Sequence, residues 1–317
     1  MNDPETTPKP LTIGVFDSGF GGLTVLRALL PLIPHAHYIY LGDTARLPYG
    51  SKSRETIARY AVSSSRFLLD QGADILVIAC NTATALALPE IESAAAPIPV
   101  FGVVQPGAQA ALASANHRAK HEANDNANDD ANNNATDKMC HPERSAKREV
   151  EGPAVHTAGA PNVLVLATTA TVQSHAYLEA LTALGLPATE KACPLLVPLV
   201  EEGWIDHPVT AEVLRIYLIE ALAEAPTADT LLLGCTHYPL LKPMIERTLA
   251  SLNHPMHIID SAQATAHAVA SHLPPSSPNQ PTTCTFYATD SIEKFQHLGT
   301  SFLGQPLTHV HHIDLGG

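Results

Sequence analysis

Two stretches of the chain share one pattern: a short aliphatic run that ends in a cysteine and continues into polar residues. Residues 73–82 read Ala-Asp-Ile-Leu-Val-Ile-Ala-Cys-Asn-Thr, and residues 228–237 read Ala-Asp-Thr-Leu-Leu-Leu-Gly-Cys-Thr-His. Such a run is typical of a strand buried on both faces of a parallel sheet, and a helical pattern follows each cysteine. Cys80 and Cys235 are therefore expected at the carboxyl ends of two strands, the edge at which open α/β sheets bind ligands.

A second pair of segments supports a duplication. Residues 11–17 and residues 162–168 both read as strands followed by a helical pattern, and they end in Asp17 and Thr168. A chain of 317 residues is long enough for two domains with cores of their own. We predict an α/β fold of two pseudo-symmetric α/β domains with mainly parallel sheets and the active site in the interdomain cleft.

The domain limits follow from where the apolar pattern stops. We expect residues 11–104 together with about 262–317 in the first domain, and residues 105–261 in the second. Between Leu112 and Val150 the chain contains no Ile, Leu, Val or Phe. Such a stretch buries too little apolar surface to offset its ordering entropy, so we predict a disordered insertion over 113–160, and a disordered lead over 1–10.

Charge and targeting signals exclude several classes of protein. Lys and Arg number 18 against 31 Asp and Glu, and no basic run is placed to neutralise phosphates, so nucleic acid is not an expected partner. No apolar stretch is long enough to span a bilayer, and the first ten residues lack a signal-peptide pattern. Five cysteines without a C-x-x-C pair fit a cytoplasmic protein with free thiols.

Two further motifs argue against common cofactors. Residues 17–22 read Asp-Ser-Gly-Phe-Gly-Gly, which fits neither the dinucleotide fingerprint nor the P-loop, and a turn that brings backbone amides to a small carboxylate is the better interpretation. Residues 309–312 read His-Val-His-His, but no partner ligands have metal-site spacing, so we expect a solvated tail there and no metal.

The two cysteines allow several chemistries. A cysteine at a strand end is most often a small buried apolar residue, but polar residues follow both of these. A helix N-terminus should lower the pKa of each thiol. A disulfide couple needs adjacent thiols, and a Cys-His hydrolase explains Cys235 with His237 but not Cys80. Inversion of a carbon centre needs one acid/base on each face, which one thiol from each half supplies.

The residues also carry a resemblance to a known family. Asp17-Ser18-Gly19, Pro48-Tyr49-Gly50, Cys80-Asn81-Thr82, Thr168 with Thr171, and Cys235-Thr236-His237 together resemble the glutamate racemases of the cofactor-independent aspartate/glutamate racemase superfamily. The similarity spans nearly the whole chain outside the lead, the insertion and a second linker at residues 274–281. Cys-Thr-His at the second cysteine resembles glutamate-specific enzymes more than aspartate racemases.

The resemblance implies interconversion of L- and D-glutamate without pyridoxal phosphate or another cofactor, supplying D-glutamate for peptidoglycan and the cell wall. By similarity, Cys80 deprotonates D-glutamate with help from Asp17, and Cys235 deprotonates L-glutamate with help from His237 and Glu201. Glu201 is preferred to Glu202 because the family motif places one acid directly after the apolar run. The residues implied in substrate binding are Asp17, Ser18, Pro48, Tyr49, Gly50, Cys80, Asn81, Thr82, Thr168, Thr171, Cys235, Thr236 and His237.

One loop departs from the family, and some alternatives remain open. Residues 167–171 read Ala-Thr-Thr-Ala-Thr where the family has glycines, and alanine does not readily adopt positive φ, so altered substrate positioning is expected there. A racemase of the same fold acting on aspartate or a hydantoin is the nearest alternative. A catalytically inactive two-lobed amino-acid-binding protein is the alternative from another class. The sequence leaves the oligomeric state open, a homodimer included.

Overall fold

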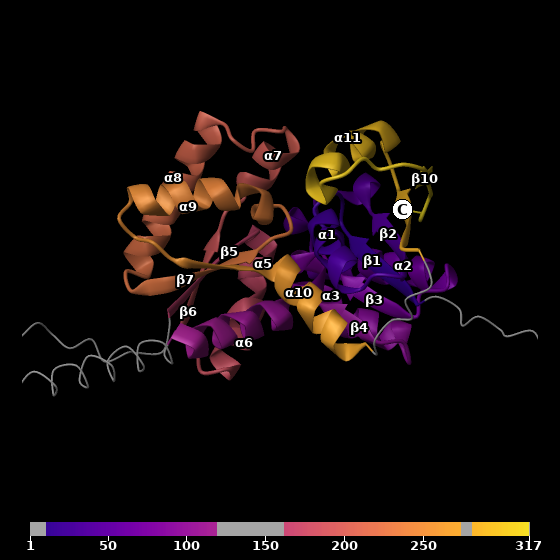
Figure 1. Cartoon of the computed structure of the whole chain (residues 1–317), viewed down its shortest axis with the longest axis horizontal. Helices are drawn as coiled ribbons and strands as arrows, with labels where there is room; N and C mark the ends of the chain where they lie inside the picture. The colour runs from indigo at the N-terminus through magenta and orange to yellow at the C-terminus, as the bar shows by residue number, and fades with distance from the viewer. Residues whose placement is uncertain (1–10, 119–161, 274–280, 317) are drawn as a thin grey trace, which may run out of the picture.

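The computed structural model describes residues 11–118, 162–273 and 281–316. The predicted disordered lead and residues 119–160 of the predicted insertion lie outside these ranges. Two parallel sheets organise the described chain, one on each side of the molecule (Figure 1). The α/β class with two mainly parallel sheets is therefore confirmed.

The larger sheet has six strands in the order β10-β9-β2-β1-β3-β4, and each neighbouring pair is parallel. Every residue of β1 is buried, as expected for an aliphatic strand covered on both faces. The strands are β1 (Thr12–Asp17), β2 (His37–Gly42), β3 (Ile75–Ile78), β4 (Val100–Gly102), β9 (Thr283–Ala288) and β10 (Val310–His312).

Alternate residues of these strands point to opposite faces of the sheet, and each face has its own core. Phe16 and Ile78 pack with the helices α2 (Arg54–Asp70) and α3 (Asn81–Ala95). Val15 and Val77 belong to the core on the other face. The helices on that face are α1 (Leu23–Leu32), α10 (Ser261–His272) and α11 (Ile292–Leu303).

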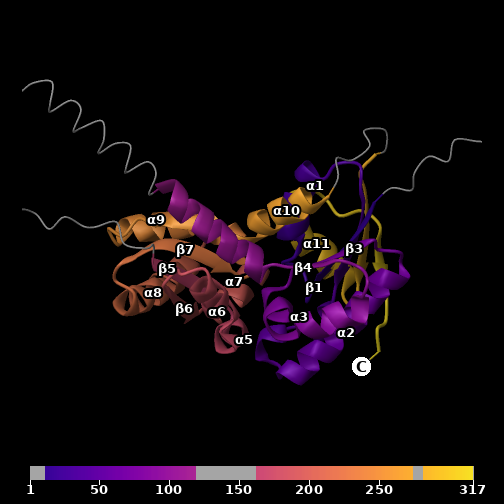
Figure 2. The ribbon, with the colours of Figure 1, turned by 90° about the horizontal axis from the view of Figure 1, so that it is seen from below.

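The smaller sheet has four parallel strands in the order β6-β5-β7-β8. They are β5 (Asn162–Ala167), β6 (Ala188–Ala192), β7 (Ala228–Gly234) and β8 (His257–Asp260). One face packs on α6 (Ala176–Ala183) and on a helix over residues 104–118, which Figure 2 shows along this sheet. The helices on the other face are α7 (Leu196–Glu201), α8 (Pro208–Glu224) and α9 (Lys242–Ser251).

Residues 113–118 correct the predicted limit of the insertion, because they continue the helix that begins at residue 104. Ala115 is buried, and the Arg118 guanidinium donates to the carboxylate of Asp229 at 3.2 Å and to the hydroxyl of Thr230 at 2.6 Å. A helix needs only one contacting face, so alanine and a single long polar side chain suffice here.

The C-terminal part of the chain joins the larger sheet. β9 pairs with β2 and β10 pairs with β9, while α10 lies between the two sheets in both views (Figures 1 and 2). The predicted solvated tail at residues 309–312 is therefore wrong for Val310–His312, which form an edge strand. No described helix is long and apolar enough to cross a membrane, and the described residues contain no cluster of three or more metal-ligating side chains.

Candidate active site

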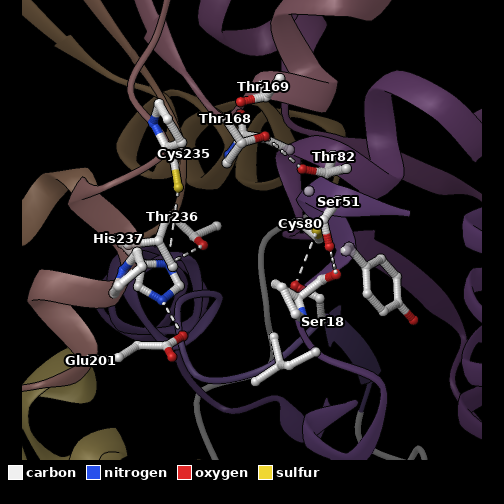
Figure 3. Close-up of a pocket in the computed structure, with 18 of the residues that line it drawn as sticks. Ser18, Ser51, Cys80, Thr82, Thr168, Thr169, Glu201, Cys235, Thr236 and His237 are labelled. Atoms are coloured by element: carbon white, nitrogen blue, oxygen red, sulfur yellow. Dashed lines mark hydrogen bonds and ion pairs between the residues drawn. The ribbon is translucent and has the colours of Figure 1, made fainter. Parts of the chain in front are cut away.

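A cavity of about 390 Å³ lies where the carboxyl ends of strands from both sheets meet. Figure 3 shows Cys80 and Ser18 on one side of it, and Cys235, His237 and Glu201 on the other. The predicted site residues that line it are Ser18, Pro48, Tyr49, Gly50, Cys80, Asn81, Thr82, Thr168, Glu201, Cys235, Thr236 and His237.

Two predicted residues, Asp17 and Thr171, lie buried behind the lining rather than in it. The other lining residues include Glu202, which was weighed against Glu201 and not chosen. Sequence reasoning missed the rest, which are Leu47, Ser51, Thr169, Pro194, Val197 and Pro198. Ser51 and Thr169 are direct neighbours of predicted residues, and Pro194 to Pro198 belong to the apolar run before Glu201. These lining residues could therefore have been found from the sequence, because they are neighbours of residues that were predicted.

Cys80 stands at the N-cap of α3, where its Sγ accepts the backbone N–H of Ala83 at 3.4 Å. Its thiol lies 3.5 Å from Oγ of Ser18. Burial, reinforced by the negative charge of Asp17, raises the pKa of Cys80 to about 12. The N–H of Ala83 at the helix N-terminus does lower this pKa, but desolvation of the thiolate outweighs it, so the predicted net decrease is wrong.

Asp17 ends β1 as a buried carboxylate. Oδ2 accepts the N–H of Gly19 at 2.9 Å, whereas Oδ1 has no hydrogen-bond partner in the described part of the chain. Burial raises the pKa of Asp17, and the positive charge of His237 opposes that shift. A Cβ at Gly22 would lie 2.5 Å from Cβ of Asp17, so only glycine lets the following helix approach this carboxylate.

Cys235, His237 and Glu201 form a chain of polar contacts on the opposite side. Nδ1 of His237 lies 4.0 Å from Sγ of Cys235, and Nε2 lies 3.1 Å from Oε1 of Glu201. Burial alone would lower the pKa of His237, but its contacts with Cys235 and Glu201 raise it to about 10. The ring of Phe302 meets the imidazole edge-on at 5.0 Å and fixes its plane.

Gly21 allows close contact between the turn after β1 and the residues around Cys235. A Cβ there would lie 2.1 Å from Oγ1 of Thr236 and 2.6 Å from Nδ1 of His237. The hydroxyl of Thr24, at the start of α1, donates to the backbone carbonyl of Thr236 at 3.0 Å. The glycine-rich turn after β1 and the start of α1 thus pack directly against residues 235–237.

Three hydroxyls join the two halves of the site. Oγ1 of Thr82 lies 3.0 Å from Oγ1 of Thr168 and 3.2 Å from Oγ1 of Thr171, and the latter two are 3.0 Å apart. Thr168 is the N-cap of α5 (Thr169–Ser174) with φ −72°, and none of residues 167–171 has positive φ. The alanines at 167 and 170 therefore impose no backbone strain here, contrary to the expectation from the family's glycines.

Asn81 makes a second contact between the two halves. Its Oδ1 accepts the hydroxyl of Tyr177 from α6 at 2.6 Å. Its Nδ2 is buried and has no partner among the described residues, although the residue lines the cavity. Asn81 therefore offers an unused hydrogen-bond donor at the site.

Comparison with known proteins gives one consistent result. Residues 23–120 and 152–269 match the family described as Asp/Glu/Hydantoin racemase. A glutamate racemase of Koribacter versatilis (strain Ellin345) is 46% identical over 331 residues, which cover 96% of this chain and 98% of the relative.

Solved structures agree over almost the full length. The glutamate racemase of Thermus thermophilus, in complex with β-chloro-D-alanine, superposes with a TM-score of 0.74 at 36% identity, covering 97% of this chain and 99% of that one. The glutamate racemase of Francisella tularensis subsp. tularensis, in complex with D-glutamate, has a TM-score of 0.74 at 29% identity, covering 97% and 98%.

Proposed function

The chain belongs to the Asp/Glu/hydantoin racemase family, and we propose that the two thiols of its cleft interconvert L- and D-glutamate by moving a proton between the faces of the α-carbon. One observation carries the proposal: Cys80 and Cys235 line the same cavity, and they come from equivalent strand ends of two different sheets. An α-carbon between them has one sulfur on each face, which inversion requires.

The conversion of L-glutamate begins with the Cys235 thiolate, as the resemblance implies. Its Sγ takes the α-proton, so that the C–H bond breaks, an S–H bond forms, and the electron pair stays on the substrate as a carbanion. The Cys80 thiol then gives its proton to the opposite face, breaking S–H and forming C–H. The cycle leaves a thiol at Cys235 and a thiolate at Cys80. After D-glutamate leaves, Cys235 releases its proton to water and Cys80 takes one from water, which restores the starting state. D-glutamate reacts by the same steps in reverse, from the Cys80 thiolate and the Cys235 thiol.

The charges around the thiols support this starting state. A His237 pKa raised to about 10 means that the ring is protonated at neutral pH, which places a cation 4.0 Å from the sulfur of Cys235. A Cys80 pKa raised to about 12 keeps that thiol protonated and ready to donate. Glu201 holds the imidazolium in place, and Asp17 assists at Cys80.

Substrate recognition would use groups that are polar and incompletely satisfied. The Nδ2 atom of Asn81 is a buried donor suited to a carboxylate. Ser18, Thr82, Thr168 and Thr236 add hydroxyls at the cavity wall, with Pro48, Tyr49 and Gly50 forming a further wall. Thr171 would act from behind by orienting Thr82 and Thr168.

Several expectations from the sequence accompany this proposal. The product D-glutamate would serve peptidoglycan synthesis. The domains would comprise residues 11–104 with about 262–317, and residues 105–261. The cytoplasmic location and a homodimer stay predictions.

The test is incubation of the full chain with L-glutamate in heavy water without pyridoxal phosphate, following optical rotation and the α-proton signal. Rotation should fall to zero as deuterium enters. Cys80→Ser should still exchange the α-proton of L-glutamate but not that of D-glutamate. Cys235→Ser should exchange only the α-proton of D-glutamate. Neither variant should racemise its substrate. Cys193→Ser, a buried cysteine outside the cavity, is the matched control and should racemise normally.

Other outcomes identify the alternatives. Racemisation at the native rate by either active-site variant would contradict the two-thiol mechanism. Inversion of aspartate or a hydantoin in place of glutamate would assign a different substrate. Binding of glutamate without α-proton exchange by the native chain would favour an inactive binding protein.

A further inference from the structure

A second buried carboxylate, Asp43, lies outside the cavity and plays no part in the proton transfer. It directly follows β2 and is fully buried. Its oxygens accept Nε of Arg46 at 2.9 and 2.7 Å, the hydroxyl of Tyr49 at 2.5 Å and the hydroxyl of Thr289 at 3.0 Å. A buried charge held by this many donors fixes the geometry of all of them.

Tyr49 connects this carboxylate to the cleft. The residue is 2% exposed and begins the turn η2 (Tyr49–Ser51). Its hydroxyl is bonded to Asp43, while Tyr49 and its neighbours Gly50 and Ser51 line the cavity. The hydroxyl therefore anchors the cavity wall rather than reaching a ligand.

The hydrogen bonds around Asp43 are rigid because Arg46 and Thr289, its other partners, make further contacts of their own. The guanidinium of Arg46 lies over the ring of Tyr60, with Cζ 4.5 Å from its centroid, and the ring of Tyr49 lies 6.1 Å from the same ring. The hydroxyl of Thr289 accepts the N–H of Ala45 at 2.9 Å. Since Thr289 directly follows β9, that strand also helps to hold this network in place.

We propose that Asp43 is a positioning residue that fixes the cleft wall of residues 48–51 through the Tyr49 hydroxyl and so sets the affinity for glutamate. The inference rests on the proposed function for the identity of the ligand. Loss of the anchor lets the wall shift, and a displacement of a fraction of an ångström weakens the contacts that hold the substrate.

The test compares Tyr49→Phe with Tyr38→Phe. Tyr38 is also buried, stands in β2, and donates its hydroxyl to the backbone carbonyl of Ile33 at 2.7 Å. Both variants lose one buried tyrosine hydroxyl and should lose similar thermal stability. Tyr49→Phe should raise KM about tenfold in both directions with kcat within about twofold, as for loss of a hydrogen bond to a charged group, while Tyr38→Phe leaves KM unchanged.

A double variant tests the route through Tyr49. If Asp43 acts through that hydroxyl, adding Asp43→Asn to Tyr49→Phe raises KM by less than the product of the two single effects. An unchanged KM in Tyr49→Phe, or fully multiplicative effects, would overturn the proposal. Asp43→Asn leaves the charge of Arg46 uncompensated and can prevent folding. In that case the KM of Tyr49→Phe alone decides between the outcomes.

Calorimetric titration with D-glutamate separates this inference from the racemase mechanism. In a Cys80→Ser background, which does not turn over D-glutamate, Tyr49→Phe should weaken Kd by the same tenfold. A native chain that binds D-glutamate but does not racemise it would contradict the proposed function and leave the positioning role measurable.

Discussion

The imidazole of His237 bridges Cys235 and Glu201, with Nδ1 4.0 Å from the sulfur and Nε2 3.1 Å from the carboxylate. Cys80 instead has the hydroxyl of Ser18 at 3.5 Å and the charge of Asp17 nearby. The two faces of the cleft are therefore electrostatically unequal although the strand–helix units that carry them are alike. A cation lies beside Cys235, whereas burial and the anion beside Cys80 raise the pKa of that thiol.

This asymmetry predicts selective alkylation of the free protein. Iodoacetamide at neutral pH should modify Cys235 at least about tenfold faster than Cys80, since the thiolate is the reacting species. Peptide mapping by mass spectrometry over time measures both rates, and D-glutamate should protect both sites. In His237→Gln the preference should decrease but not disappear, because burial and Asp17 still raise the pKa of Cys80. Faster modification of Cys80 in the native chain would contradict the assigned resting state.

Glu201 and Glu202 offer a matched pair, because both line the cavity and only Glu201 has a hydrogen bond to His237. Glu201→Gln should lower kcat/KM about tenfold, as for loss of a charge-assisted hydrogen bond, and Glu202→Gln less than about threefold. The equilibrium constant of a racemisation is one, so kcat/KM must fall equally in both directions. Equal losses in the two variants would remove Glu201 from the catalytic chain.

The sequence predicted the parts of this site that depend on repeated local pattern. Cys80 and Cys235 were placed by the strand runs before them, whereas Glu201 came from resemblance. The raised pKa of Cys80 could not be predicted, because it depends on burial in the folded chain and on the nearby charge of Asp17. Nor was β6 expected, since Ala-Thr-Glu-Lys-Ala at a sheet edge shows no apolar pattern.

Tyr177 was also absent from the sequence prediction, because its contact with Asn81 joins residues far apart in the chain. Its hydroxyl occupies Oδ1 and leaves Nδ2 as the donor at the cavity. Tyr177→Phe should raise KM three- to tenfold with a smaller change in kcat, because Asn81 can then rotate its amide. Tyr38→Phe again controls for the loss of a buried hydroxyl, and equal KM values in the two variants would argue against this role.

The raised pKa of Cys80 has a consequence for stability at alkaline pH. Its ordinary value is 9.0 and its value in the fold is about 12, so below pH 9 the thiol is protonated in both the folded and unfolded chain. Between these values the unfolded chain releases the proton first, and folding stability decreases as pH rises. The decrease due to Cys80 is at most about 1.4 kcal/mol per pH unit.

Urea unfolding of the native chain and of Cys80→Ala from pH 8 to 10.5 isolates that contribution. The difference in unfolding free energy between them should be constant up to about pH 9 and then shrink as pH rises, because only the native chain has to retain the Cys80 proton. Ile78→Val, a buried change in the strand before Cys80 that removes no titrating group, should keep a constant difference over the whole range. A constant difference for Cys80→Ala as well would mean that the thiol ionises equally in both states. The asymmetry between the two faces would then depend on His237 alone.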